Sequence, residues 1–164
     1  MQFRAGAHIV VLADGMASAT LLPRGMFTDY AFLVIQQTIR ELDGMVGYEA
    51  VGRAEPFVDL LADSGAVALL IGEEDNLTLC KKKAMSKVAL IANINNMKMR
   101  RWSSARVELQ SKLAISEAKD GYGFILANQD PEIPFDVPIE NIDALIRSIE
   151  KYGRYDLAAS VTAA

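Results

Sequence analysis

Two short apolar runs, each closed by a turn residue, limit the fold of this 164-residue chain most strongly. Residues 8–13 run into Asp14-Gly15, and residues 66–71 lie between Gly65 and Gly72. Short runs of aliphatic and β-branched residues bounded by turn residues predict buried strands. A strand that is apolar on both faces needs cover on both faces, so we expect a layered α/β fold.

Helices are predicted where apolar residues recur at steps of three and four. This pattern occurs in four segments: Thr28 to Gly44, a brief helix opened by Glu55-Pro56, residues 76 to about 95, and residues 138 to 153. A short strand is predicted at 46–53, and another at 19–22 that pairs back with the first run. Strands and helices therefore alternate over the first 95 residues.

The segment 106–115 differs because it alternates strictly, with Val107, Leu109, Ser111, Leu113 and Ile115 on one side. A period of two predicts an amphipathic strand. Asp120-Gly121 has the residues of a tight hairpin turn before 122–126. The expected fold is α/β or α+β: a single mixed-sheet domain at 1–156, with alternating strands and helices followed by an antiparallel hairpin backed by a C-terminal helix. Residues 157–164 are expected to be a frayed tail.

Charge is distributed unevenly along the chain. Residues 76–107 contain eight Lys and Arg and no Asp or Glu, although the whole chain has a net charge of −4. Such a segment predicts a basic face for an anionic ligand, and nucleic acid is the first candidate. The candidate nucleic-acid-binding residues are Lys98, Arg100, Arg101, Trp102 and Arg106, with Lys81, Lys82, Lys83 and Lys87 as a more diffuse second contact.

This basic segment has plainer interpretations too. Lys81 to Lys87 can be the solvated side of an amphipathic helix. Trp102 can stack on an unpaired base, or it can anchor the core as the only tryptophan of the chain. An acidic protein partner remains a third possibility for the basic face.

Carboxylates follow both apolar runs. Asp14 comes after the first, and Glu73, Glu74 and Asp75 come after the second. At the carboxyl ends of parallel strands they could converge on Mg²⁺ for hydrolysis. They can equally be a turn aspartate and the acidic start of a helix.

Other chemistry is poorly supported by the sequence. One cysteine, Cys80, and one histidine, His8, exclude an internal disulfide and a zinc site built from several Cys and His of one chain. No nucleophile elbow and no glycine-rich phosphate loop occur, so we expect no cofactor and no metal site. The N-terminus is unlike a secretory signal and no run is long enough to cross a membrane, which predicts a cytoplasmic protein.

The sequence alone therefore favours a non-enzymatic assembly or binding module that contacts nucleic acid through 76–107 and associates with itself. Two alternatives remain open. One is a self-assembling structural component of a particle, such as a viral one, held together by its opposite charges. The other is a Mg²⁺-dependent hydrolase that uses the strand-end carboxylates.

Overall fold

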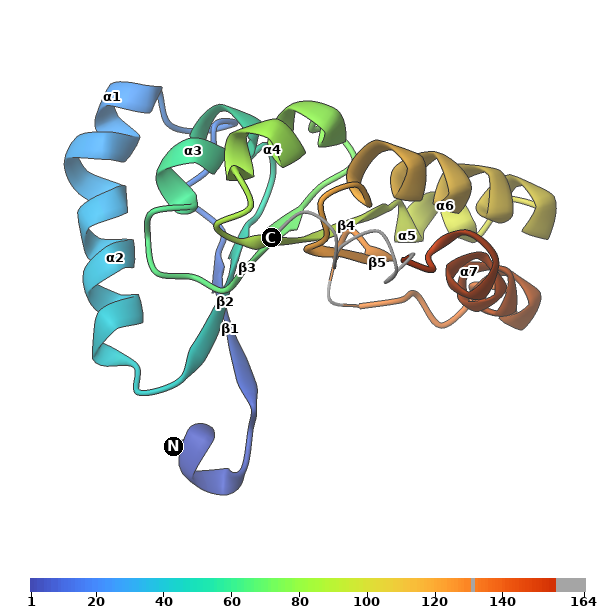
Figure 1. The fold of residues 1–164 in the computed structure, drawn as a ribbon, viewed down its shortest axis with the longest axis horizontal. Helices are drawn as coiled ribbons and strands as arrows, with labels where there is room; N and C mark the ends of the chain where they lie inside the picture. The colour runs from blue at the N-terminus through green and yellow to red at the C-terminus, as the bar shows by residue number, and fades with distance from the viewer. Residues whose placement is uncertain (131, 156–164) are drawn as a thin grey trace, which may run out of the picture.

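The computed structural model describes residues 1–130 and 132–155, and one sheet of five parallel strands forms its centre (Figure 1). The strands are β1 (Ile9–Asp14), β2 (Met45–Ala50), β3 (Ala68–Ile71), β4 (Ala89–Ile94) and β5 (Phe124–Asn128). Each strand pairs with the next one along the chain, in the order β1-β2-β3-β4-β5. All five carboxyl ends therefore lie along one edge of the sheet.

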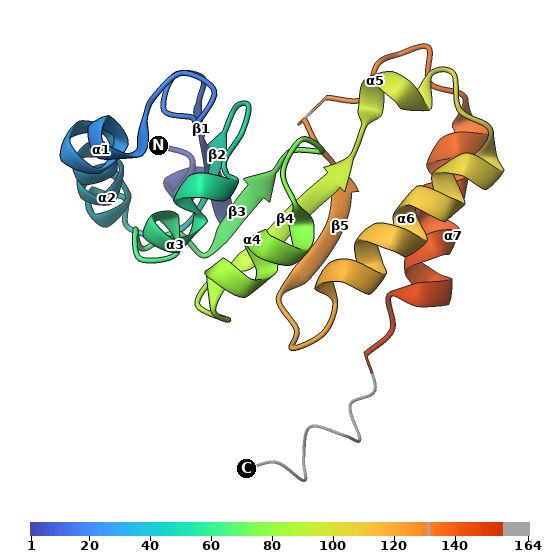
Figure 2. The same ribbon diagram turned by 90° about the horizontal axis from the view of Figure 1, so that it is seen from above.

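Helical segments fill every crossover between these strands, as parallel pairing requires. They are α1 (Arg24–Met26), the π-helical turn η2 (Phe27–Ala31), α2 (Phe32–Glu41), η3 (Glu55–Phe57), α3 (Val58–Leu61), α4 (Leu77–Ala84), α5 (Asn96–Met99) and α6 (Ser104–Ala118). Two further helical segments lie outside the crossovers: η1 (Phe3–Ala5) precedes β1, and α7 (Ile139–Tyr152) follows β5. Figure 2 shows β3, β4 and β5 pointing toward the edge where α5 lies, with α7 beside α6.

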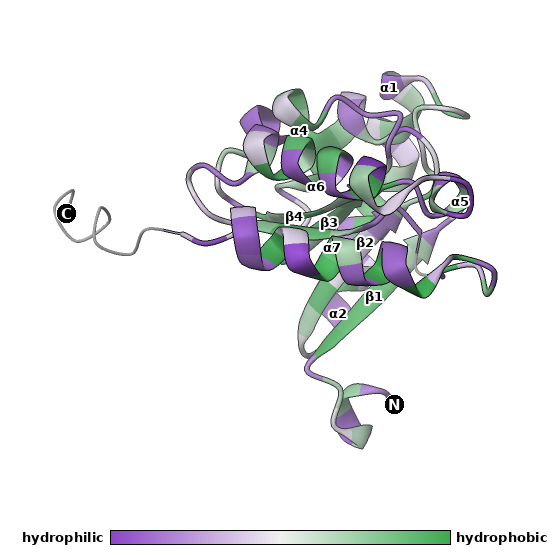
Figure 3. Cartoon of the chain, turned by 90° about the vertical axis from the view of Figure 1, so that its right-hand side faces the viewer, coloured by the Kyte–Doolittle hydropathy of each residue, from purple (hydrophilic) through white to green (hydrophobic). Residues whose placement is uncertain are grey.

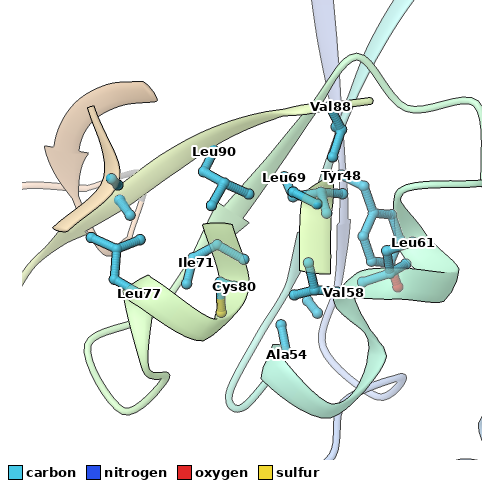
Figure 4. Packing of buried hydrophobic residues seen from close by; sticks show 14 of the residues in the cluster. Tyr48, Ala54, Val58, Leu61, Leu69, Ile71, Leu77, Cys80, Val88 and Leu90 are labelled. Carbon is cyan, nitrogen blue, oxygen red and sulfur yellow. The ribbon is translucent and has the colours of Figure 1, made fainter. Parts of the chain in front are cut away.

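The hydrophobic core lies between the helices and one face of the sheet. Tyr48, Leu69 and Leu90 project from three neighbouring strands and are almost fully buried. They meet Val58 of α3 and Cys80 of α4, which are completely buried (Figure 4). Burying each of these side chains contributes about 1.5–3 kcal/mol, so this layer holds helices and sheet together.

The opposite face of the sheet is apolar but exposed. The strand register places Ile9, Val11, Met45 and Ile125 on this face, and each remains 46–51% exposed. Figure 3 shows β1 as a mostly hydrophobic strand. A parallel sheet with helices on one face and an apolar opposite face is the arrangement found in the wall of a (β/α) barrel.

The predicted antiparallel hairpin is wrong, because residues 107–115 lie within the helix α6. Val107, Ser111 and Ile115 are buried, and their spacing of four fits a helix as well as a strand. Leu109 and Leu113, which a strand would bury with them, are both 45% exposed. The mixed sheet is therefore replaced by a purely parallel one.

The predicted helix over 76–95 is also wrong in its second half. The helix α4 ends at Ala84, and Met85 and Ser86 adopt left-handed backbone angles, with φ of 48° and 57°. The chain then turns into β4, which the sequence analysis did not predict. Residues 19–22 form a turn instead of a strand.

Other elements are confirmed. Strands occur within 8–14, 45–50 and 68–71, and helices occur over 32–41 and 139–152. The predicted tail at 157–164 lies outside the described residues. Within residues 1–130 and 132–155, no helix combines the length and the hydropathy that crossing a membrane requires.

Candidate active site

A cleft of about 410 Å³ opens at the carboxyl edge of the sheet, between the loops that follow β2, β3 and β5. Its volume is in the range of small-molecule sites. Its polar lining comes from five segments that lie far apart in the sequence: Thr20, Glu49, Glu73, Glu74, Asn95, Gln129 and Asp130. No Lys or Arg occurs among the described lining residues, so the cleft is acidic.

Glu49 is the most deeply placed acid in this cleft. It lies on β2 beside Leu70 of β3, on the open face of the sheet, and only 6% of it is exposed. No donor among residues 1–130 and 132–155 forms a hydrogen bond to its carboxylate. Burial raises the pKa of the Glu49 carboxyl, and the negative charge of Asp130 raises it further. Glu49 can therefore hold a proton that ordinary glutamates lose.

Glu73, in contrast, is fully engaged by its neighbours. Its Oε1 accepts from Lys98 Nζ at 2.8 Å and from Asn95 Nδ2 at 2.5 Å. Asn95 also caps α5, because its Oδ1 accepts from the Lys98 backbone N–H at 2.6 Å. The Glu73 backbone N–H donates to Gln129 Oε1 at 3.3 Å. This network links the loops after β3, β4 and β5 and neutralises one carboxylate of the site.

Asp75 has a structural role next to the cleft. It is only 5% exposed, and its two oxygens accept from the backbone N–H groups of Ala54 and Glu55 at 2.9 and 3.0 Å. Burial is the largest effect on its carboxyl and raises its pKa, although the two N–H donors oppose the shift. Asp75 therefore fixes the loop after β2, which carries the cleft residue Gly52.

Asp14 does not join the carboxylates that follow β3. Its Oδ1 accepts from the backbone N–H groups of Met16 and Ala17, which makes a turn, and its Oδ2 accepts from Tyr48 Oη at 3.2 Å. Burial and the nearby Asp14 raise the pKa of the Tyr48 hydroxyl, so that it stays protonated and donates. Within the described residues, no group of three or more His, Cys, Asp or Glu is arranged to hold a metal ion. The predicted convergence of Asp14 with Glu73 to Asp75 on Mg²⁺ is therefore not formed.

The predicted basic face is divided between several elements. Lys87 precedes β4 and Lys98 follows it, so the two lie at opposite edges of the sheet. Four of the candidate residues form ion pairs: Lys83 with Glu55, Lys87 with Asp63, Lys98 with Glu73 and Arg100 with Asp136. Lys81 donates to the backbone carbonyl of Tyr122, while Lys82 and Arg101 are exposed.

Trp102 packs against the core, which is the second of its two predicted roles, instead of lying free to stack on a base. It is half-buried, and the Arg106 guanidinium lies 5.9 Å from its ring centre. Cys80 and His8 offer no nucleophile pair, because Cys80 is buried in α4 and His8 precedes β1 at the amino edge. Burial raises the pKa of the Cys80 thiol to about 12.

The sequence analysis missed the residues that form the cleft. Glu49 was part of a predicted strand, Asn95 was taken as the end of a helix, and Gln129 and Asp130 were given no role. One signal was present: Glu49 is the only charged residue between Met45 and Ala50, and a charge inside a buried strand needs a reason.

Comparison with known proteins agrees with a barrel-type enzyme. The family model described as uroporphyrinogen decarboxylase (URO-D) matches residues 1–152. A methyltransferase from Methanosarcina mazei superposes with a TM-score of 0.81 at 20% identity, over 93% of this chain and 44% of that chain. This chain thus spans less than half the length of that methyltransferase. No curated protein matches the sequence.

These findings correct the predicted function. A match to an enzyme family over residues 1–152 and a parallel barrel-type sheet contradict a nucleic-acid-binding module and a viral or other structural component. They also replace the hydrolase alternative, whose metal site the described carboxylates do not form. The physical reason is that the charged segment is not one surface: its cations lie on separate elements, and several are already paired.

Proposed function

The chain belongs to the uroporphyrinogen decarboxylase family, and we propose that its carboxyl-edge cleft is where an enzyme of this family carries out one-carbon chemistry, with Glu49 as the acid–base residue. The position supports this proposal, since (β/α) barrels place their active sites at the carboxyl ends of the strands. The family match supports an enzyme, and the cleft gathers polar side chains from five segments of the described chain at the carboxyl edge of the sheet.

The environment of Glu49 is the observation that carries the proposal. A glutamate that is only 6% exposed, has no hydrogen-bond donor among the described residues and has a raised carboxyl pKa is suited to deliver or accept a proton. Structural carboxylates in the same region differ, because Asp75 and Glu73 are satisfied by backbone, amide and lysine donors. Glu49 is thus a largely buried acid of the cleft that remains available to a substrate.

Methyl transfer is the reaction that the charge of the cleft supports best. A substrate carboxylate would find no Lys or Arg among the described lining residues, whereas a neutral or cationic methyl donor fits an acidic cleft. When a methyl group leaves a nitrogen or oxygen for an acceptor nucleophile such as a thiolate, the bonding electron pair stays on the heteroatom. A neutral amine or ether would leave as an anion, so transfer of the Glu49 proton to the heteroatom before or during bond cleavage lets it leave as a neutral amine or alcohol, and Glu49 becomes ionised.

Decarboxylation is the second candidate, and the family match favours it. In that reaction a carbon–carbon bond breaks, carbon dioxide leaves, and the electron pair left on carbon takes up a proton. A protonated Glu49 would supply that proton. Repulsion between the acidic cleft and the substrate carboxylate would be relieved as neutral carbon dioxide departs.

The proposed place of action is the cytoplasm. The support is the cysteine usage: the chain has a single cysteine, Cys80, and sparse cysteine without an internal disulfide is typical of proteins from a reducing compartment.

The test is a paired assay on the protein and its Glu49→Gln variant. Transfer of a labelled methyl group to a thiol and release of carbon dioxide from carboxylated substrates would be measured side by side. We expect methyl transfer, and a loss of about 10²–10⁴-fold in its rate in the variant. Glu150→Gln, which removes an exposed acid of α7, should leave the rate unchanged. Full activity of Glu49→Gln in both assays would contradict the proposal.

A further inference from the structure

The acids of the cleft are not equally neutralised. Lys98 and Asn95 donate hydrogen bonds to the Glu73 carboxylate, and the positive charge of Lys98 compensates its negative charge. Asp130 receives one weak bond, from Gln129 Nε2 at 3.2 Å, and Glu49 receives none from the described residues. Two carboxylates, one from β2 and one from the loop after β5, therefore share the cleft, and no Lys or Arg of residues 1–130 and 132–155 lies among its lining residues.

The walls around these two carboxylates are small or apolar. Ala50, Gly52, Leu70 and Gly72 line the cleft beside them. Gly52 lies against the loop after β1, since a Cβ built on it would be 2.7 Å from Thr20 Oγ1. The space left is suited to a compact group with a few carbon atoms, held at one end by charge.

We propose that the substrate of this cleft carries a positively charged nitrogen that donates to Glu49 and lies beside Asp130, so that its chemical class is an alkylamine or alkylammonium compound. This inference deepens the proposed function and rests on it for the location of the reaction. It adds a class of substrate to the location of the reaction.

The physical argument is the cost of an unpaired buried carboxylate. A carboxylate that is largely buried is stabilised by a proton or by a cation, because removing an isolated charge from water is costly. A neutral amine that meets protonated Glu49 and an ammonium ion that meets ionised Glu49 give the same ion pair. In both cases an N–H group of the ligand donates to the Glu49 carboxylate, which accepts no hydrogen bond from the described residues.

The surrounding charges favour the same class of ligand. The other acids that line the cleft are Asp130 after β5, whose charge acts on Glu49, and Glu73 and Glu74 after β3, and Lys98 pairs with Glu73. On the neighbouring strand β1, the residues on the same face are Ile9, Val11 and Ala13, which do not titrate. An anion would meet only repulsion here, while an ammonium group would be attracted by every uncompensated side chain.

Binding can be tested without any assay of turnover. The probes are dimethylammonium, isopropanol as a neutral molecule of similar size, and acetate as an anion. Each is titrated at constant ionic strength while the backbone amide signals of Glu49, Gly52 and Asp130 are followed by NMR. We expect saturable shifts with dimethylammonium alone, and affinity that falls as the pH is lowered and Glu49 takes up its proton.

Variants separate this inference from a general acidic surface. Glu49→Gln should weaken dimethylammonium binding about tenfold or more, and Asp130→Asn should weaken it less, while Glu150→Gln should have no effect. Circular dichroism confirms that each variant is folded. Equal binding of dimethylammonium and isopropanol, or unchanged binding in Glu49→Gln, would overturn the inference. The inference would also be overturned if Zn²⁺ or Mg²⁺ shifted the amide signals of Glu49, Gly52 and Asp130 and displaced dimethylammonium.

The two proposals fail in different ways. Ammonium binding that depends on Glu49, with no one-carbon chemistry, would contradict the proposed function and leave the substrate class standing. Glu49-dependent turnover of neutral substrates, with no ammonium binding, would contradict the substrate class alone.

Discussion

Glu49 and Asp130 come from opposite sides of the cleft, from β2 and from the segment after β5, and the charge of Asp130 adds to burial in raising the pKa of Glu49. Eighty residues lie between them in sequence, and the parallel order of the five strands brings them to the same edge of the sheet. The account of function depends on this relationship.

Gly52→Ala should damage both the cleft and the fold. The residue has φ of +96°, and an added Cβ would lie 2.7 Å from Thr20 Oγ1 and 3.2 Å from Ser18 Oγ. We expect a loss of about 1–3 kcal/mol in the free energy of unfolding, measured in urea. Gly15→Ala is the matched control, since nothing lies within 4 Å of its added Cβ, and it should be close to neutral. Equal stability of both variants would show that this loop is not held as described.

Asp75→Ala removes the acceptor of two backbone N–H groups. The N–H groups of Ala54 and Glu55 then lose their partners, one of them in a buried position. The free energy of unfolding should fall by about 2–3 kcal/mol. Asp63→Ala removes an exposed carboxylate that pairs with Lys87, and it should cost less than about 1 kcal/mol. A similar cost for both would contradict the structural role of Asp75.

Lys98→Ala should make the cleft more acidic without unfolding the protein. Glu73 loses the cation 2.8 Å from its carboxylate, while the lysine side chain itself is 56% exposed. Dimethylammonium should bind more tightly, and the gain should shrink in 0.5 M salt, at a Debye length of roughly 4 Å. Arg100→Ala breaks the pair with Asp136, outside the cleft, and should leave binding unchanged. Weaker binding in Lys98→Ala would count against the charge argument.

Cys80 should be inert to thiol reagents in the folded protein. Its pKa of about 12 leaves a thiolate fraction of about 10⁻⁴ at pH 8, and the side chain is fully buried. Labelling with iodoacetamide at pH 8 should be negligible, and it should go to completion after unfolding in urea. Rapid labelling of the folded protein would show that α4 opens or that the thiol is accessible.

The sequence predicted the strands better than their arrangement. The apolar runs at 8–13 and 66–71 do contain strands, but only β3 is buried, whereas Ile9 and Val11 of β1 are about half exposed. Residues 107–115 were misread because positions 107, 111 and 115 fit both a period of two and a helical period. The strand β4 was missed because its apolar residues continued the helical stripe of α4, and only the left-handed turn at Met85 and Ser86 separates them.

The site was harder to predict than the fold. The charge pattern predicted a binding surface at residues 76–107. In the structure, several cations of this segment instead pair with carboxylates from distant segments, as Lys98 does with Glu73. Glu49 stood alone in its strand, and its partner Asp130 lies more than seventy residues away. Pairings of this kind depend on strand order, which local periodicity does not encode.

The stability of the protein should depend on pH through Glu49. A raised pKa means that the folded state holds the proton more tightly than the unfolded chain does. Protonated Glu49 therefore contributes its full stabilisation at a pH below its pKa in the unfolded chain, which is near 4.5. This contribution is lost as the pH rises through the higher pKa of Glu49 in the folded protein. Glu49→Gln should melt about 2–4 °C higher than the unchanged protein at pH 7.5, and this advantage should vanish toward pH 4. Thermal unfolding followed by circular dichroism checks this, with Glu150→Gln as the control.

The most direct test of the central claim is the titration of the Glu49 side-chain carboxyl carbon by NMR, with and without dimethylammonium. The account predicts a midpoint above the usual value of 4.5 in the free protein, and a lower midpoint when the ammonium ion is present. A midpoint at or below 4.5 that does not respond to the ammonium ion would contradict it.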